Sequence, residues 1–325
     1  MKIRESIIVF AVCVMAGCSA RQSSPQAGRR SASLPAETYR LNGSGRWKDT
    51  SSSKEDEFLL RVAEMKRVVD AGQPNNVRKA INQLRADFPE IAGADFNAFT
   101  DGEMLLAKGK LTKAVKKYEK FLDDYPTSPL RDAALEREFG IASDGLAGRR
   151  KRVLLIFNLS RFEEGVKIMD KISDRAGTTE IAKRAMLAVV SSYERRRKFD
   201  LAYLKWSEIQ TRFPTGQLAQ DALEGMARTK YATYRGKEYD ATGLISAKTY
   251  YENYKLRYPG DAQKLQVDDI LLRINEQLAE KQLDIAQYYD RTGSKGPANM
   301  YYQMVVDGWP QSKAARTARE KISKK

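Results

Sequence analysis

Apolar residues recur every three to four positions along most of the chain beyond residue 55, with charged residues between them. One stretch shows this pattern at Phe58, Leu59, Val62, Met65, Val68 and Val69. The spacing places these side chains on one face of a helix, and it predicts a helix that buries one side. A second such stretch begins near Val77 and ends at Phe88, before Pro89. No alternation of period two reaches a useful length, so the pattern favours an all-α fold.

One internal spacing recurs within these helical stretches. An alanine is followed four residues later by a large aromatic residue and eight residues after that by a proline, in the sets Ala114/Tyr118/Pro126, Ala202/Trp206/Pro214, Ala247/Tyr251/Pro259 and Ala298/Tyr302/Pro310. The residue before each proline is also aromatic: Tyr125, Phe213, Tyr258 and Trp309. The alanine lets two helices approach, the aromatic residue fills the space beside the next pair, and the proline ends the helix. Such a recurrence predicts stacked helical hairpins, which offer a binding surface.

Two further hairpins keep the spacing with other residues. The first has Val77 and Ile81 before Pro89, and the third is degenerate, with Gly165 and Met169 in the first two positions and Gly177 where the proline would stand. We therefore expect an α-solenoid of about six helical hairpins over residues 55–325.

Composition narrows the possible functions. The chain has 325 residues, with 57 Lys and Arg against 42 Asp and Glu, for a formal net charge of +15. That excess favours anionic partners, whether nucleic acid, lipid headgroups or acidic protein faces. There is no histidine, and the two cysteines are Cys13 and Cys18. His-dependent catalytic triads and His-based zinc sites are excluded, and no phosphate-binding loop or nucleophile motif is present. We expect no catalytic activity, no cofactor and no metal site.

The first residues resemble a secretory signal. Lys2 and Arg4 precede a short apolar stretch, residues 7–15, which is too short to span a membrane as a helix. Met15-Ala16-Gly17-Cys18 then resembles a bacterial lipoprotein box, although its first position is usually leucine. The alternative is an ordinary signal peptide that happens to contain two cysteines. The lipoprotein interpretation explains why cysteine occurs only here, and it makes Cys18 the lipid-bearing residue.

The next segment has a different composition. Residues 18–54 are rich in Ser, Arg, Gln, Gly and Pro and poor in apolar side chains, which is typical of a disordered tether. We therefore divide the chain into a signal peptide (1–17), a lipid-anchored tether (18–54) and a solenoid (55–325). In diderm lipoproteins, a serine such as Ser19 after the lipidated cysteine favours the outer membrane, and a signal peptide takes the protein away from nucleic acid.

Two basic runs could bind an acidic partner. Residues 149–152 read Arg-Arg-Lys-Arg, and residues 194–198 read Glu-Arg-Arg-Arg-Lys. The first is more simply explained as the solvated start of a buried helix. The second lies at the end of a predicted helix, where basic residues complement the helix dipole by about 0.3–1 kcal/mol.

The alanine–aromatic–proline spacing resembles the tetratricopeptide repeat. The turns Tyr125-Pro-Thr-Ser128 and Trp309-Pro-Gln-Ser312, together with the phrase from Ala286 to Gly293, narrow the likeness. With the lipoprotein box they make the chain similar to the BamD (YfiO, ComL) family of outer-membrane β-barrel assembly lipoproteins. The resemblance covers about residues 55–325, and it is strongest over 98–130 and 280–320 and weak over 140–180.

The resemblance implies a right-handed tetratricopeptide-like solenoid that acts as a non-enzymatic scaffold on the periplasmic face of the outer membrane. Its implied partners are the periplasmic domains of the β-barrel assembly protein and nascent outer-membrane proteins. Because the first helices of tetratricopeptide pairs line the concave surface, the implied binding residues are Ser191, Arg195, Gln287 and Arg291. The alternative is a tetratricopeptide envelope lipoprotein that serves cell-wall synthesis or Tol-Pal-type envelope constriction.

Overall fold

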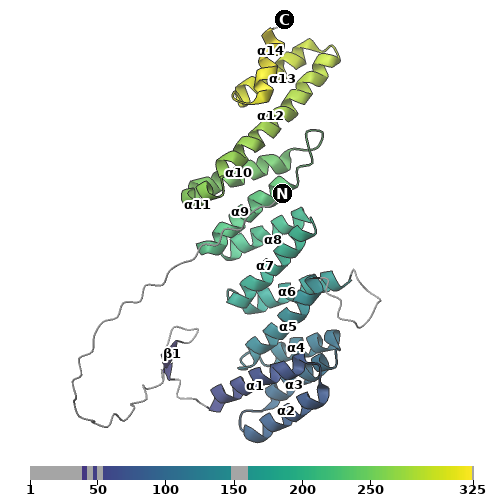
Figure 1. Ribbon diagram of the computed structural model, residues 1–325, viewed down its shortest axis with the longest axis vertical. Helices are drawn as coiled ribbons and strands as arrows, with labels where there is room; N and C mark the ends of the chain where they lie inside the picture. Colours follow the sequence, from purple (N-terminus) through teal and green to yellow (C-terminus); the bar gives the residue numbers. More distant parts are fainter. Residues whose placement is uncertain (1–38, 42–46, 50–53, 148–159, 324–325) are drawn as a thin grey trace, which may run out of the picture. The chain divides into compact units, whose positions relative to one another are not determined.

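The computed structural model describes residues 39–41, 47–49, 54–147 and 160–323 (Figure 1). Two short strands, β1 (Tyr39–Leu41) and β2 (Trp47–Asp49), pair antiparallel, with Leu41 opposite Trp47. They fall inside the segment predicted as a tether. The rest of that segment and the predicted signal peptide lie outside the described residues.

The unit that follows, Lys54–Lys325, consists of helices and turns throughout its described residues. Six pairs of consecutive helices form it: α1 (Lys54–Asp70) with α2 (Pro74–Asp87), α3 (Ala94–Ala107) with α4 (Leu111–Asp124), α5 (Arg131–Leu146) with α6 (Ser160–Ala176), α7 (Glu180–Arg195) with α8 (Phe199–Arg212), α9 (Gly216–Ala232) with α10 (Thr242–Arg257), and α12 (Val267–Arg291) with α13 (Lys295–Gly308). Two further helices complete the unit: α11 (Pro259–Lys264) follows the α9/α10 pair, and α14 (Lys313–Ser323) follows the α12/α13 pair. Figure 1 shows the pairs stacked in chain order. The predicted all-α, tetratricopeptide-like solenoid of about six hairpins is confirmed.

The residues of the recurring spacing lie in the core. All four alanines are completely buried, and the four aromatic residues that follow them are buried as well. Two of these rings press on glycines: a Cβ on Gly102 would lie 2.4 Å from the Tyr118 ring, and a Cβ on Gly225 would lie 2.3 Å from the Trp206 ring. Close packing of rings on bare backbone therefore joins helices both within and between hairpins.

The aromatic residue before each proline ends its helix. Tyr125 has φ −130° and ψ 62°, and Phe213, Tyr258 and Trp309 have similar angles. These angles lie outside the helical region, because a proline disfavours helical backbone in the residue before it. The Tyr125 N–H still donates to the Phe121 carbonyl at 2.9 Å, so the last turn of α4 stays closed.

In the degenerate third hairpin, glycines allow the close approach of the two helices and end the second one. A Cβ on Gly165 of α6 would lie 3.0 Å from the Ala142 carbonyl oxygen of α5, so only a very small residue fits where the other hairpins have alanine. Gly177 stands in place of the proline and has φ +61°, a left-handed conformation that ends α6. Helix α6 therefore ends at the expected place although the proline of the other hairpins is missing.

Ion pairs connect the second helices of neighbouring hairpins. Glu119 of α4 pairs with Lys171 of α6, and Asp123 of α4 pairs with Arg175 of α6, each with an N–O distance of 2.6 Å. The pairing works because residues four apart lie on one face of a helix, so two acids meet two bases in register.

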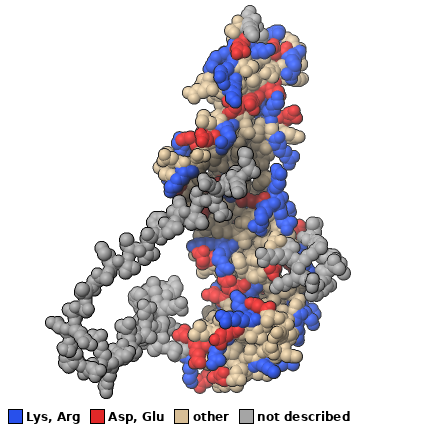
Figure 2. All heavy atoms as spheres, in the orientation of Figure 1, with Lys and Arg blue, Asp and Glu red and all other residues tan. Residues whose placement is uncertain are grey.

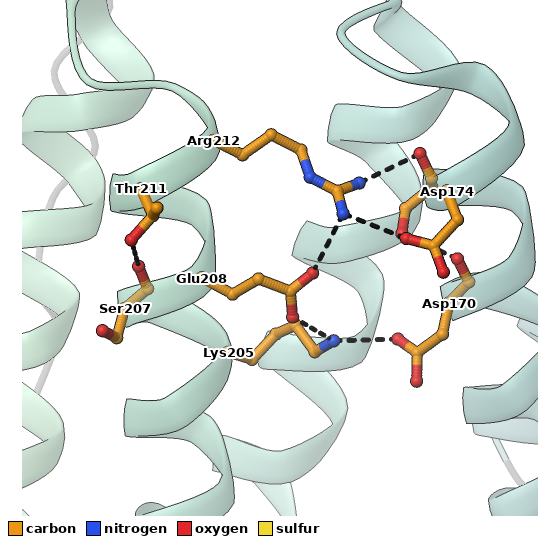
Figure 3. A network of polar contacts seen from close by, with 8 residues as sticks. Asp170, Asp174, Lys205, Ser207, Glu208, Thr211 and Arg212 are labelled. Atoms are coloured by element: carbon orange, nitrogen blue, oxygen red, sulfur yellow. Dashed lines mark hydrogen bonds and ion pairs between the residues drawn. The ribbon is translucent and has the colours of Figure 1, made fainter.

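The next junction repeats this arrangement (Figure 3). Asp170 of α6 accepts from Lys205 of α8 at 2.9 Å, and Asp174 accepts from Arg212 at 3.0 Å. Glu208, which lies on α8 as well, forms ion pairs with both Lys205 and Arg212. Helix α6 thus shows acids to α8 and bases to α4. We call these contacts the ion-pair ladder.

We expect the ladder to contribute modestly and in a salt-dependent way. Replacing Lys205 and Arg212 with Glu should lower the free energy of unfolding by about 1–2 kcal/mol, because each pair is partly solvated and like charges then face each other. Adding Asp170→Lys and Asp174→Lys should restore most of the loss. Urea unfolding at 20 mM and 500 mM NaCl would measure both effects. A loss unchanged by salt would show that packing, and not charge, was disturbed.

Candidate functional site

A groove of about 430 Å³ lies between the first helices of the third and fourth hairpins. Helix α5 contributes Phe139, Ser143 and Leu146, and α7 contributes Leu187 and a second set of residues on the same face: Arg184, Ala188, Ser191, Ser192 and Arg195. These residues recur every three to four positions on each helix, so each helix turns one continuous stripe toward the groove. We call this site the α5/α7 groove.

The floor of the groove is formed by apolar side chains that are partly exposed to solvent. Phe139 and Ala188 are partly exposed and pack on the main hydrophobic core, whereas Leu146 is buried. Leu187 is also partly exposed, and it packs on the neighbouring cluster around Trp206. Hydroxyl groups of Ser143 and Ser191 stand among these apolar side chains. A surface of this kind can bury apolar side chains and satisfy backbone polar groups of a bound chain.

The two arginines of the groove differ electrostatically. Arg184 Nη1 lies 2.6 Å from Glu136 Oε1, and its guanidinium carbon lies 4.4 Å from the centre of the Phe139 ring. Arg195 is exposed and donates to the Ser192 hydroxyl at 3.0 Å. It forms no ion pair with any described residue. One arginine is therefore neutralised within the fold, while the other keeps its charge at the rim.

The basic run that follows α7 has only part of its charge compensated. Glu194 accepts from Trp206 Nε1 and from Arg228, both at 2.9 Å, so it is used by other helices. Arg196 and Lys198 lie over the ring of Phe162, at 4.0 and 5.3 Å from its centre. Over the visible face as a whole, Lys and Arg are interspersed with Asp and Glu (Figure 2). The bases at positions 195–198 form no ion pair with a described residue, although two of them lie over the Phe162 ring.

The structure brings two of the predicted binding residues together. Ser191 and Arg195 line the α5/α7 groove, as expected for a first helix. Gln287 and Arg291 lie on α12, two hairpins further along, where Gln287 is half-buried and Arg291 is exposed at the last residue of the helix. They form no part of this groove. Cys18 and residues 149–152 lie outside the described residues.

The α5 side of the groove was missed from the sequence. Phe139 and Leu146 belong to the hairpin whose repeat pattern is degenerate, so their position relative to α7 could not be assigned. A usable signal exists in the spacing of Phe139, Ser143 and Leu146, which lie four and three residues apart along one face of a helix.

The described ranges offer neither a metal site nor a membrane-spanning helix. They contain no cluster of three or more metal-binding side chains. Within the same ranges, no helix is long and apolar enough to cross a membrane.

No protein-family model matches this chain. A search of curated proteins also finds no match. Among solved structures, the C-terminal part of a TPR repeat-containing protein from Cytophaga hutchinsonii aligns with a TM-score of 0.36 and 16% identity, covering 83% of this chain and 88% of that one. PilW, described as a widely conserved type IV pilus biogenesis factor, aligns with a TM-score of 0.28 and 16% identity, covering 80% and 97%. At these identities and TM-scores, neither structure says what this chain binds.

Proposed function

We propose that this chain is a non-enzymatic scaffold lipoprotein of the outer membrane that takes part in the assembly of β-barrel proteins. The observation that carries the proposal is the α5/α7 groove, an apolar surface with a charged rim that the fold leaves open on two first helices. A solenoid with such a groove can hold a segment of another protein without chemistry of its own.

Sequence features support the proposed location and partner. The lipoprotein box at residues 15–18 supports an anchor at Cys18, and the phrases near residues 125 and 286–293 support a role like that of the BamD family. The proposed partners are the periplasmic domains of the β-barrel assembly protein and nascent outer-membrane proteins. A lipid-anchored solenoid would hold these proteins close to the membrane into which barrels insert.

Affinity purification from detergent-solubilised envelopes tests the function. We expect β-barrel assembly components to co-purify with the tagged chain, and depletion to lower the level of outer-membrane barrels. Absence of both effects would contradict the proposal. Recovery of peptidoglycan-synthesis or Tol-Pal proteins in their place would favour envelope maintenance, for which the unpaired bases beside the groove would suit an anionic envelope polymer.

The anchor has its own test. Replacing Cys18 with Ser should move the chain from the membrane fraction to the soluble periplasmic fraction, because the acyl chains and not the helices would hold it to the bilayer. Fractionation followed by immunoblotting measures this. Cys13→Ser is the matched control and should leave the chain on the membrane, since residue 13 would be removed with the signal peptide.

A further inference from the structure

The α5/α7 groove carries a charge that the fold does not use. The other arginines whose contacts define the stack are paired: Arg137 with Glu103, Arg175 with Asp123, Arg212 with Asp174 and Arg228 with Glu194. Arg195 has only the Ser192 hydroxyl, and neither Arg196, Arg197 nor Lys198 forms an ion pair with a described residue. A run of four bases without an acid therefore begins at the rim of the groove.

The neighbouring sequence does not supply the missing acid. The carboxylate of Glu194 is already engaged by Trp206 and Arg228. The charge at this end of the groove is thus complementary to an acidic group from outside the chain.

The apolar floor of the groove indicates which kind of molecule would carry the acidic group. Phe139, Leu187 and Ala188 are apolar and partly exposed, and they adjoin Arg195 within one groove. A small inorganic anion would leave this floor uncovered. A fatty acid would cover it but would press an acyl chain against the hydroxyl groups of Ser143 and Ser191, which would lose their hydrogen bonds to water without replacement. A polypeptide offers apolar side chains for the floor and backbone groups for the hydroxyls.

We propose that the α5/α7 groove binds a segment of a partner protein that combines apolar side chains with an acidic residue. The apolar side chains lie on Phe139 and Leu187, and the carboxylate pairs with Arg195. The proposal rests on the scaffold function proposed above and gives the chemistry of the segment that the scaffold recognises.

The test uses the purified full-length chain and two fluorescein-labelled peptides. The acidic probe is a ten-residue peptide of Leu, Phe and Ser with two Asp residues at one end, and the basic probe has Lys in place of Asp. Fluorescence anisotropy should show binding of the acidic probe only. Arg195→Gln should weaken that binding by about five- to tenfold, as expected for loss of a partly solvated charged contact. Arg257→Gln, which removes an exposed base at the end of α10, outside the groove and outside the basic run, is the matched control and should have no effect.

Two further variants complete the test: one reverses the charge at residue 195, and the other fills the groove with a large side chain. Arg195→Glu should abolish binding of the acidic probe and create binding of the basic one. Ser191→Trp should abolish binding of both probes to any variant by filling the groove from an exposed position. Circular dichroism spectra of all variants should match the wild type, because none of these side chains is part of the core.

Three results would overturn the proposal. The first is equal binding of the two probes to the wild type, and the second is a preference of the Arg195→Glu variant for the acidic probe. The third is binding of oleate to the wild type when neither peptide binds. These outcomes are separable from failure of the scaffold function. Co-purification of β-barrel assembly components would persist if only the groove chemistry were wrong, and the probe results would persist if only the assembly role were wrong.

Discussion

Replacing Arg137 with Met should destabilise the solenoid by about 3–5 kcal/mol, the largest effect that we expect from a single change. The Arg137 side chain is buried on α5, and its Nε donates to Glu103 Oε1 of α3 at 2.8 Å. Its Nη1 reaches Asp70 Oδ1, at the end of α1, at 2.6 Å. One guanidinium thus joins the first helices of three hairpins.

The cost comes from the carboxylate that remains. Glu103 is only 1% exposed, and besides Arg137 it accepts from the Tyr118 hydroxyl at 2.5 Å. Without Arg137 its charge would be buried beside a neutral hydroxyl. Burial, with the Glu103 carboxylate next in importance, raises the pKa of Tyr118, so its hydroxyl keeps the proton that it donates to Glu103.

Urea unfolding followed by circular dichroism would measure the loss, and hydrogen exchange in α3 and α5 would show where it acts. Tyr118→Phe is the matched control: it removes one hydrogen bond and keeps the ion pair, so we expect a loss of only about 1 kcal/mol. The double variant Arg137→Met with Glu103→Leu should recover much of the stability, because no uncompensated charge remains. A loss below 1 kcal/mol for Arg137→Met alone would mean that Glu103 gains water in the folded state.

The second large effect should be a gain of stability at alkaline pH when Glu138 is replaced with Met. Glu138 is 1% exposed on α5, and neither carboxylate oxygen has a hydrogen-bond partner among the described residues. Burial raises the pKa of Glu138 from its ordinary 4.5 to about 8. The bases Arg175 and Lys171 of α6 oppose this rise in pKa, and the acids Glu119 and Asp123 of α4 add to it.

The sign follows from which state holds the proton. Between pH 4.5 and about 8 the folded chain binds a proton at Glu138 that the unfolded chain has lost, so stability falls as pH rises through this range. The contribution of this proton to stability is complete below pH 4.5 and is lost by about pH 8. Methionine has a similar length and no charge, and it removes the dependence. Relative to wild type, the variant should gain about 2–4 kcal/mol on going from pH 5 to pH 8.

Urea midpoints of the two proteins at pH 5, 6, 7 and 8 would measure this difference. Glu136→Met is the matched control on the same helix, because Glu136 is more exposed and pairs with Arg184, so it should show no comparable gain. Parallel pH profiles for wild type and Glu138→Met would contradict the prediction.

The fold could be predicted because its main determinants are local. The alanine, aromatic and proline positions lie within twelve residues of each other, and they encode the approach of two helices and the end of the second one. Where the third hairpin departs from the pattern, Gly165 and Gly177 still mark the close approach and the stop, so six hairpins could be counted.

The groove and the buried charges could be predicted only in part. The repeat offsets placed Ser191 and Arg195 correctly on a first helix, but the opposite wall comes from a hairpin whose repeat offsets are obscured. Arg137 reaches partners 34 and 67 residues away. In the sequence it stands between Glu136 and Glu138 and looks like part of a solvated face. Which of these three side chains is exposed depends on how the hairpins stack, and no pattern within one helix contains that information.

The ion-pair ladder also gives the stack a direction. Helix α6 offers acids to the hairpin that follows it and bases to the hairpin that precedes it. Exchanging the two faces of α6 would turn its acids toward the acids of α4 and its bases toward the bases of α8, so the charges favour one order of the three helices. The charges of α4, α6 and α8 therefore act as a head-to-tail code.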